Sequence, residues 1–295
     1  MNKIAIMMRL KLTGEALNNE GTIGNVIQPR QIEFPNGEVR QAISGEMLKH
    51  YHSRNLRLLA DENELCDTCK IFSPMKNGKV KESDDRLSPS GNKVKECIVD
   101  DIEGFMNAGK GANEKRTSCV KFSYAIATEE NEYQVMLHTR VDVTQDNNKK
   151  KQDKETTEGE GNTNKDQNTQ MLFHRPLRNN EYAITIQVDL DRIGYDDEKL
   201  IYALDEDTIK SRQEKCIRAL LNMFVDMEGA MCSTRLPHIE GIEGIIVKKT
   251  DKNQVLSKYS ALQDDYKEVN EKISDESIIF NNIIEFSEVM KHSVI

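Results

Sequence analysis

The sequence lacks the motifs that mark the common hydrolases and nucleotide-binding enzymes. It contains no Gly-x-Ser-x-Gly, no His-Glu-x-x-His and no P-loop. A nucleophile elbow, a zinc-protease helix and a phosphate-binding loop of the usual kinds are therefore excluded. A hydrolase that uses His50 or His52 as its general base is a distant alternative, because none of these motifs is present.

Long apolar runs are also missing. No window approaches the ~18 apolar residues that a membrane span needs, and Arg9 interrupts the first apolar run before it reaches signal-peptide length. We expect a cytoplasmic protein with no membrane partner and with reduced thiols. Cys119, Cys216 and Cys232 have apolar neighbours and are expected to be small core residues.

Acidic residues outnumber basic ones over the whole chain, but basic residues outnumber acidic ones near its start. The net charge is −9, yet residues 1–60 hold eight Lys or Arg against five Glu and no Asp. Residues 251–295 hold five Lys against nine acids. Because polyanions are bound mainly by clustered Lys and Arg, a polyanion site is allowed in the first part of the chain despite the net acidity.

Residues 43–59 predict an amphipathic helix with one basic face. Ser44 stands where an N-cap is expected. At about 100° per residue, the apolar arc contains Met47, Leu48, Tyr51, Asn55, Leu58 and Leu59. The opposite arc contains Lys49, His50, Ser53, Arg54 and Arg57 and no acid. Such a face suits a polyanion, whereas an ordinary solvated helix face is the alternative.

The periodic segments predict an α+β fold. Strands are expected at 3–12, with a basic outer face, and at 120–128, 182–190 and 241–248, and helices at 44–59 and 207–229. Their order is that of the ferredoxin-like βαββαβ arrangement. A hairpin is expected around Pro35-Asn36-Gly37, and helices near 261–273 and 278–290 are expected to close the back of the domain.

The RNA-recognition version of this fold stacks bases on exposed aromatic side chains. Tryptophan is absent here, and aromatic residues make up 5% of the chain. Any bound RNA is therefore expected to be held by its backbone rather than read by sequence.

Two segments interrupt this pattern. Residues 61–115 have no clear period and contain Cys66 and Cys69 at the spacing of a zinc half-site. A second Cys-x-x-Cys pair is missing and only Cys97 follows, so we expect no cofactor, with zinc at Cys66 and Cys69 as the alternative. Residues 146–169 contain no Val, Ile, Leu, Met or aromatic residue and cannot order themselves. Their extended flanks suggest a protruding hairpin, with an unusually long surface loop as the alternative.

Five short motifs occur in the order seen in the DevR family, the backbone subunits of type I CRISPR Cascade complexes in the RAMP superfamily. The motifs are Leu17–Gly21, Ile43–His52, Arg140–Val143, Gln170–Phe173 and Ser233–His238. The chain resembles this family from its first strand to about Val247, and the Gly-x-Met-Leu-Lys-His-x-His element is the most specific part.

The resemblance implies a single RAMP-type domain shaped like a right hand. Its parts would be a ferredoxin-like palm, a finger insertion at 61–115 and a thumb hairpin at 135–182 with a disordered tip at 146–169. Residues 251–295 would form an acidic C-terminal segment. The family role is non-catalytic: copies polymerise along a CRISPR guide RNA in antiviral defence. The implied partners are this guide RNA, neighbouring copies, other Cascade subunits and the target DNA strand through guide pairing.

The resemblance also implies which residues contact RNA. These are Asn18, Asn19, Gly21, Lys49, His50, His52, Arg54, Arg57, Arg140, Gln170, Met171, Phe173, Ser233, Thr234 and Arg235. Lys and Arg would bind phosphate, and Met171 or Phe173 would wedge a displaced base. One alternative is an RNA-cleaving RAMP subunit, although the loop after the first strand offers Glu15 and Glu20 but no Asp. Another is a solitary RNA-binding autoregulator stabilised by zinc.

Overall fold

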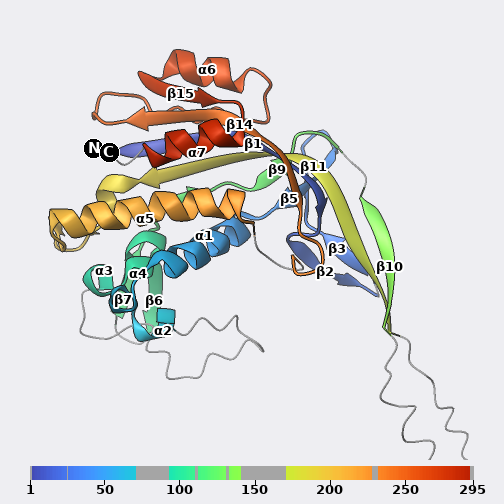
Figure 1. The fold of residues 1–295 in the computed structure, drawn as a ribbon, viewed down its shortest axis with the longest axis horizontal. Helices are drawn as coiled ribbons and strands as arrows, with labels where there is room; N and C mark the ends of the chain where they lie inside the picture. Colours follow the sequence, from blue (N-terminus) through green and yellow to red (C-terminus); the bar gives the residue numbers. More distant parts are fainter. Residues whose placement is uncertain are drawn as a thin grey trace, which may run out of the picture.

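The chain folds around one large, mainly antiparallel sheet with helices on both faces (Figure 1). The computed structural model describes residues 2–24, 26–70, 93–109, 112–130, 133–140, 171–227 and 232–292. No helix among these residues is long and apolar enough to cross a bilayer. The predicted disordered tip at 146–169 lies outside the described residues.

The centre of the molecule is a βαββαβ unit, which we call the core unit. It consists of β1 (Lys3–Glu15), α1 (Gly45–Leu59), β8 (Val120–Phe122) with β9 (Ala125–Ala127), β11 (Met171–Asp189), α5 (Glu206–Val225) and β14 (His238–Lys249). The strands of the sheet follow one another in the order β15 (Glu276–Phe280), β14, β1, β11, β9, β5 (Val39–Ile43) and β4 (Gln31–Glu33), with β8 also paired to β11. All core-unit pairings are antiparallel. This is the strand order of a split βαβ unit, so the predicted α+β ferredoxin-like class is confirmed.

The two faces of β1 are covered by different parts of the chain. Even-numbered residues from Ile4 to Leu12 join the main apolar core beneath α1 and α5. Ala5 and Met7 point the other way and are fully buried against Ala261 and Tyr266. The expected basic outer face is therefore corrected in part, because the C-terminal segment covers Arg9 whereas Lys11 stays exposed. The Arg9 guanidinium lies 5.4 Å from the centre of the Tyr266 ring and 2.8 Å from Asp264.

The C-terminal segment adds a strand to the sheet as well as two helices. α6 (Tyr266–Ile273) is followed by β15 (Glu276–Phe280) and α7 (Ile283–Lys291). The prediction of a helix at 278–290 is thus wrong for its first residues, which belong to β15. β15 pairs with Gly244–Lys248 of β14, where β-branched residues are favoured, and Asn282 then caps α7 through the amides of Ile284 and Glu285.

Helix α1 has nearly the predicted ends, but its buried arc is rotated. Ser44 caps it through the amide of Met47, whereas the buried residues include His52 and Leu56. Leu58, expected in the core, is 68% exposed. Packing against α5 accounts for the rotation, because α1 contacts α5 and His52 Nε2 lies 3.0 Å from the Cys216 carbonyl of that helix. α5 also ends at Val225, earlier than the predicted Gly229.

The remaining strands form hairpins at the sheet's edge. β4 (Gln31–Glu33) and β5 (Val39–Ile43) pair around the turn at Pro35–Gly37, as predicted. β2 (Asn19–Ile23) pairs with β3 (Val26–Pro29). β10 (Gln134–Arg140) pairs with β11 from Met171 to Leu177, and the two strands leave the sheet as a long arm (Figure 1).

The described residues of 61–70 and 93–116 form a small group beside α1 and α5, which we call the insertion lobe. It contains η1 (Glu62–Glu64), α2 (Asp67–Lys70), α3 (Lys93–Glu96), α4 (Ile98–Glu103) and the hairpin of β6 (Phe105–Gly109) and β7 (Ala112–Arg116). Next to it lie η3 (Leu190–Arg192), β12 (Tyr195–Asp196) and β13 (Ile201–Tyr202). Cys119 and Cys216 are buried in the core as expected, and Cys232 is half-buried.

Candidate nucleic-acid interface

Several predicted motifs meet at one end of the central sheet. In the strand register, Thr13 of β1 lies between Asn179 of β11 and His238 of β14. The loop that follows β1, the base of the β10–β11 arm and the segment before β14 are therefore neighbours. The start of α1 joins them, because Asn18 Oδ1 accepts a 2.6 Å hydrogen bond from the Ser44 amide.

A buried ion pair holds the loop after β1 in place. Glu15 and Arg178 are both almost fully buried, with 2.6 Å between Arg178 Nε and Glu15 Oε1. Glu15 Oε2 accepts from the Leu17 amide at 2.6 Å, and Arg178 donates to the Leu17 carbonyl. The hydroxyl of Tyr182 donates to Glu15, and burial, followed by the charge of Glu15, raises the pKa of Tyr182. These bonds leave Asn18 in the left-handed backbone region, with φ of 52°.

The first residue of α1 must be small. A Cβ on Gly45 would lie 2.9 Å from the Phe122 carbonyl oxygen and 3.2 Å from that of Ser123. Glycine thus lets the helix begin directly against the end of β8. The free amides of the first turn of α1 consequently lie at the same end of the sheet as the loop after β1, and such amides favour anions.

The predicted basic face of α1 is exposed in part. His50 is exposed, while Lys49, Arg54 and Arg57 are half-buried. Desolvation and then the charges of Arg54 and Arg57 lower the pKa of His50. Desolvation also lowers the pKa of Arg57, with Arg54 adding to the effect and Cys69 opposing it. The three side chains therefore lie close enough to act on one another, with the positive charge carried by Arg54 and Arg57.

A second positive pair, which the sequence prediction missed in part, lies at the base of the arm. Arg235 donates to the Pro176 carbonyl at 2.9 Å, and desolvation followed by the charge of Arg175 lowers the pKa of Arg235. Arg175 was not among the predicted contacts. The period of two along β11 could have found it, because positions 171, 173 and 175 share one face of the strand.

The structure corrects the interpretation of His52. Its side chain is fully buried. Its Nδ1 contacts Glu103 of α4, and its Nε2 lies 3.0 Å from the Cys216 carbonyl of α5. His52 therefore joins α1 to α4 and α5 and is not accessible to RNA. Both ring nitrogens are engaged, which also removes it as an accessible general base.

Of the other residues predicted to contact RNA, some are placed by the structure and some lie outside the described residues. Gly21, Ser233 and Thr234 are exposed. Asn19 is half-buried, and within the described part of the chain its Oδ1 is a buried acceptor that receives no hydrogen bond. Arg140 is placed opposite Met171, and Phe173 opposite His138, in the strand register. The side chains of Arg140, Met171 and Phe173, and all of Gln170, lie outside the described residues.

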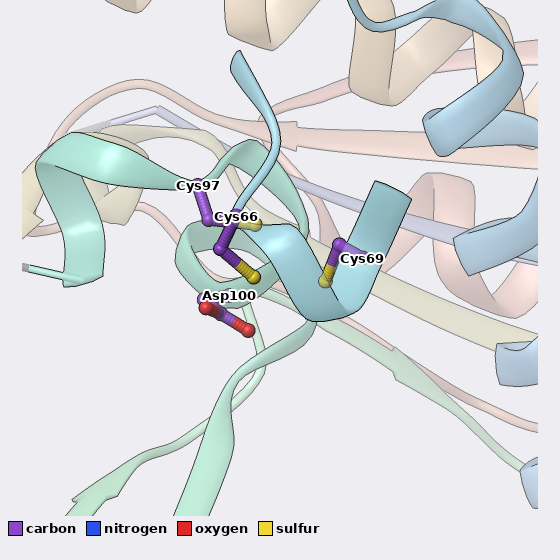
Figure 2. Close-up of side chains that lie close together, drawn as sticks. All are labelled: Cys66, Cys69, Cys97 and Asp100. Carbon is purple, nitrogen blue, oxygen red and sulfur yellow. The ribbon is translucent and has the colours of Figure 1, made fainter. Parts of the chain in front are cut away.

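Among the described residues, the group that could hold a metal ion lies in the insertion lobe and not at this end of the sheet. Cys66, Cys69, Cys97 and Asp100 bring their ligand atoms within 4.8 Å of one another (Figure 2). Burial and then the charge of Cys66 raise the pKa of Asp100 to about 7. A hydrogen bond from Cys66 is the largest cause that raises the pKa of Cys97 to about 12.

Comparison with known proteins identifies a CRISPR-associated family. The family model "CRISPR-associated negative auto-regulator DevR/Csa2" matches residues 6–271. No curated protein matches. One similar solved structure is a chain of a "CRISPR RNA-guided surveillance complex", with 14% identity, a TM-score of 0.44 and coverage of 85% of this chain and 70% of that chain.

A second similar structure is titled "CRISPR RNA-guided surveillance complex, pre-nicking". It has the same identity, TM-score and coverage of this chain, and 79% of the other chain is covered. These two likenesses are too distant to support an argument about function. The family model, however, spans most of the sequence, and the chain belongs to the CRISPR-associated DevR/Csa2 family.

Proposed function

We propose that this protein is a non-catalytic backbone subunit that binds CRISPR guide RNA within a type I Cascade complex. The observation that carries the proposal is the convergence of the loop after β1, the start of α1, the Arg175–Arg235 pair and the base of the β10–β11 arm at one end of the sheet. In this proposal the RNA backbone crosses that end and continues along the basic face of α1.

The electrostatics favour RNA at this surface. Lys49, Arg54 and Arg57 add positive charge along one helix, with His50 among them and no intervening acid. Phosphate contacts from such a face are sequence-independent, as a subunit that accepts many guides requires. The buried acceptor of Asn19 also favours a ligand here, because a donor such as a 2′-hydroxyl would remove the cost of leaving it unpaired.

The burial of Glu15 and Glu103 supports a non-catalytic role. Glu15 is fully buried and paired with Arg178, and the Glu103 carboxylate is buried against His52. Neither carboxylate is accessible to an RNA phosphate or to an attacking water. We therefore expect bound RNA to remain intact in the presence of Mg²⁺ or Mn²⁺; cleavage products would support the RNA-cleaving alternative.

The arm supports contact with neighbouring copies. Val135, Met136 and Leu137 of β10 are 46%, 42% and 57% exposed. Three consecutive large apolar side chains on a strand are a liability in a lone molecule. Assembly along a shared RNA would cover them, and the acidic surfaces elsewhere on the chain would disfavour wrong partners.

The RNA-binding surface is tested by filter binding of a guide-length single-stranded RNA over a range of salt concentrations. The test variant is Lys49→Ala with Arg54→Ala. If each residue contacts one phosphate, the slope of log K against log salt falls by about 1.4, because each single-strand contact contributes about 0.7.

The matched control is Lys252→Ala with Lys291→Ala, which removes the same charge from exposed positions in the C-terminal segment. This control should bind with nearly the parental salt slope. Equal slopes for the two double variants would contradict the proposed RNA path. Failure of the parental protein to retain array-dependent RNA when it is purified with the other Cascade subunits would contradict the function itself.

A further inference from the structure

We propose that Cys66, Cys69, Cys97 and Asp100 form a tetrahedral zinc site that holds the insertion lobe together. This inference does not depend on RNA binding. It concerns four side chains from two stretches of sequence, which meet in the fold and which the interface described above does not use.

The geometry is close to that of a bound ion. The three sulfurs and a carboxylate oxygen all lie within 4.8 Å of one another, and Figure 2 shows the four side chains gathered around a common space. Around a zinc ion with Zn–S bonds of about 2.3 Å, tetrahedral sulfurs are about 3.8 Å apart. Small rotations of these side chains would therefore complete the site.

The spacing of the four residues supports the same conclusion. The first pair is Cys66-x-x-Cys69, and the second is Cys97-x-x-Asp100. Each pair lies at the start of a short helix: Cys66 precedes α2, and Cys97 is the N-cap of α4. Two i, i+3 pairs that face each other are the usual construction of a structural zinc site. The second pair does not match the Cys-x-x-Cys pattern, because its last ligand is an aspartate, and the sequence therefore did not reveal it.

The ligand chemistry favours zinc among the available cations. Three sulfurs disfavour Mg²⁺ and Ca²⁺, which prefer oxygen ligands, while mixed sulfur and oxygen donors in a tetrahedral arrangement suit Zn²⁺. A disulfide would use only two of the three cysteines and would leave Asp100 without a role. Four protein ligands leave no open position, so the site would be structural rather than catalytic.

The location defines what the metal would do. α4 is already fixed to the core unit through Asp101 and Glu103, whereas α2 follows the end of α1 and η1. Lys215 of α5 pairs with Glu64 of η1 at 2.5 Å. Zinc would join α2 to α4 and close the chain between positions 66 and 100. It would also fix the surroundings of Arg57, whose charge interacts with Cys69.

The test begins with the unaltered full-length chain, purified without chelators and without an affinity resin that carries metal. Elemental analysis should find about one zinc per chain, and a mercurial thiol reagent should release it in step with modification of three thiols. Replacement by Co²⁺ should give the visible absorption of tetrahedral cobalt bound to thiolates. Absence of zinc after growth in zinc-supplemented medium, or iron in its place, would overturn the assignment.

Variants then locate the site. Cys66→Ser with Cys69→Ser should lose the zinc, and Asp100→Cys should retain it. The matched control is Cys232→Ser, which changes a half-buried cysteine outside the cluster and should keep one zinc per chain. Equal zinc in the double variant and the control would contradict the proposal. If the double variant does not fold, thiol-linked zinc release from the unaltered protein decides the result.

Discussion

The core unit and the insertion lobe are stabilised by different kinds of contact. The core unit buries a continuous apolar cluster that includes β1, β11, α1 and α5. The described part of the insertion lobe buries as many charged side chains, Lys93, Asp101, Glu103 and Arg116, as apolar ones, Val94, Cys97, Ile98 and Ile102. Apolar contacts depend on area and tolerate small shifts. The charged contacts of the lobe need partners in defined positions.

Asp101 is the centre of the charged contacts. Its carboxylate lies 2.6 Å from Arg116 of β7 and 2.9 Å from Arg212 of α5, and it also accepts from the Gly194 amide at 2.9 Å. Arg212 in turn donates to the Val94 carbonyl at 2.6 Å. The Asp101 carboxylate therefore makes several of the contacts between the lobe and the core unit. The difference between the two regions leads to three predictions.

The largest expected effect is that of Asp101→Ala. This change leaves two buried guanidinium groups without their carboxylate, and breaking a buried ion pair in this way costs about 3–5 kcal/mol of unfolding free energy. Urea unfolding followed by circular dichroism measures the change. The control is Asp197→Asn, which also removes a partner of Arg116 but at a carboxylate that is 40% exposed; it should cost no more than about 1 kcal/mol. Similar losses of unfolding free energy in both variants would contradict the prediction that the buried carboxylate matters more than the exposed one.

The second prediction concerns the core unit and the rotation of α1. Leu56→Ala should cost about 2–5 kcal/mol of unfolding free energy, because Leu56 is fully buried and its truncation leaves a cavity. Leu58→Ala, two positions later, should change stability by less than about 0.5 kcal/mol, because Leu58 is 68% exposed. The same unfolding measurement compares the two. A larger loss of unfolding free energy for Leu58→Ala than for Leu56→Ala would support the buried face of α1 that was expected from the sequence.

The smallest effect is a pH dependence of RNA binding at His50. Desolvation, Arg54 and Arg57 lower the pKa of His50 in the free protein, so the ring is neutral at neutral pH. A nearby phosphate would raise this pKa. Binding then takes up a proton, and RNA affinity should rise as the pH falls, by at most about tenfold for each unit between the free and bound pKa values. Filter binding between pH 5.5 and 8 measures this pH dependence of RNA affinity.

His50→Gln provides the comparison, because glutamine can donate a hydrogen bond but does not titrate in this range. Its affinity should vary less with pH than that of the parental chain. Identical pH profiles would show that His50 does not face RNA phosphate. The Asp101 variant, in contrast, should alter stability without altering this profile.

Much of the core unit could be predicted because its signals are local. Alternation in β1 and β14, the apolar period of α5 and the Ser44 cap each depend on a few neighbouring residues. Their order along the chain then indicated the α+β class. Where local signals competed, the prediction failed. Ile278 and Ile279 fit either a helix or a strand, and pairing with β14 decided for the strand.

The candidate interface could be predicted only in part. Basic residues at helical spacing indicated Lys49, His50, Arg54 and Arg57, and the family motifs pointed to the loop after β1 and to Arg235. The sequence could not distinguish His52 from its neighbour His50. Burial of His52 depends on Glu103 and Cys216, which lie 51 and 164 positions away.

The α+β class, the amphipathic α1, the hairpin at Pro35–Gly37 and the family could all be predicted from the sequence, because each depends on local periodicity, turn chemistry or motif order. Tertiary structure alone decided which face of α1 is buried, how the C-terminal segment covers β1, and how Asp100 joins three cysteines. These features arise from contacts between segments far apart in the chain, where packing and charge pairing outweigh local preference.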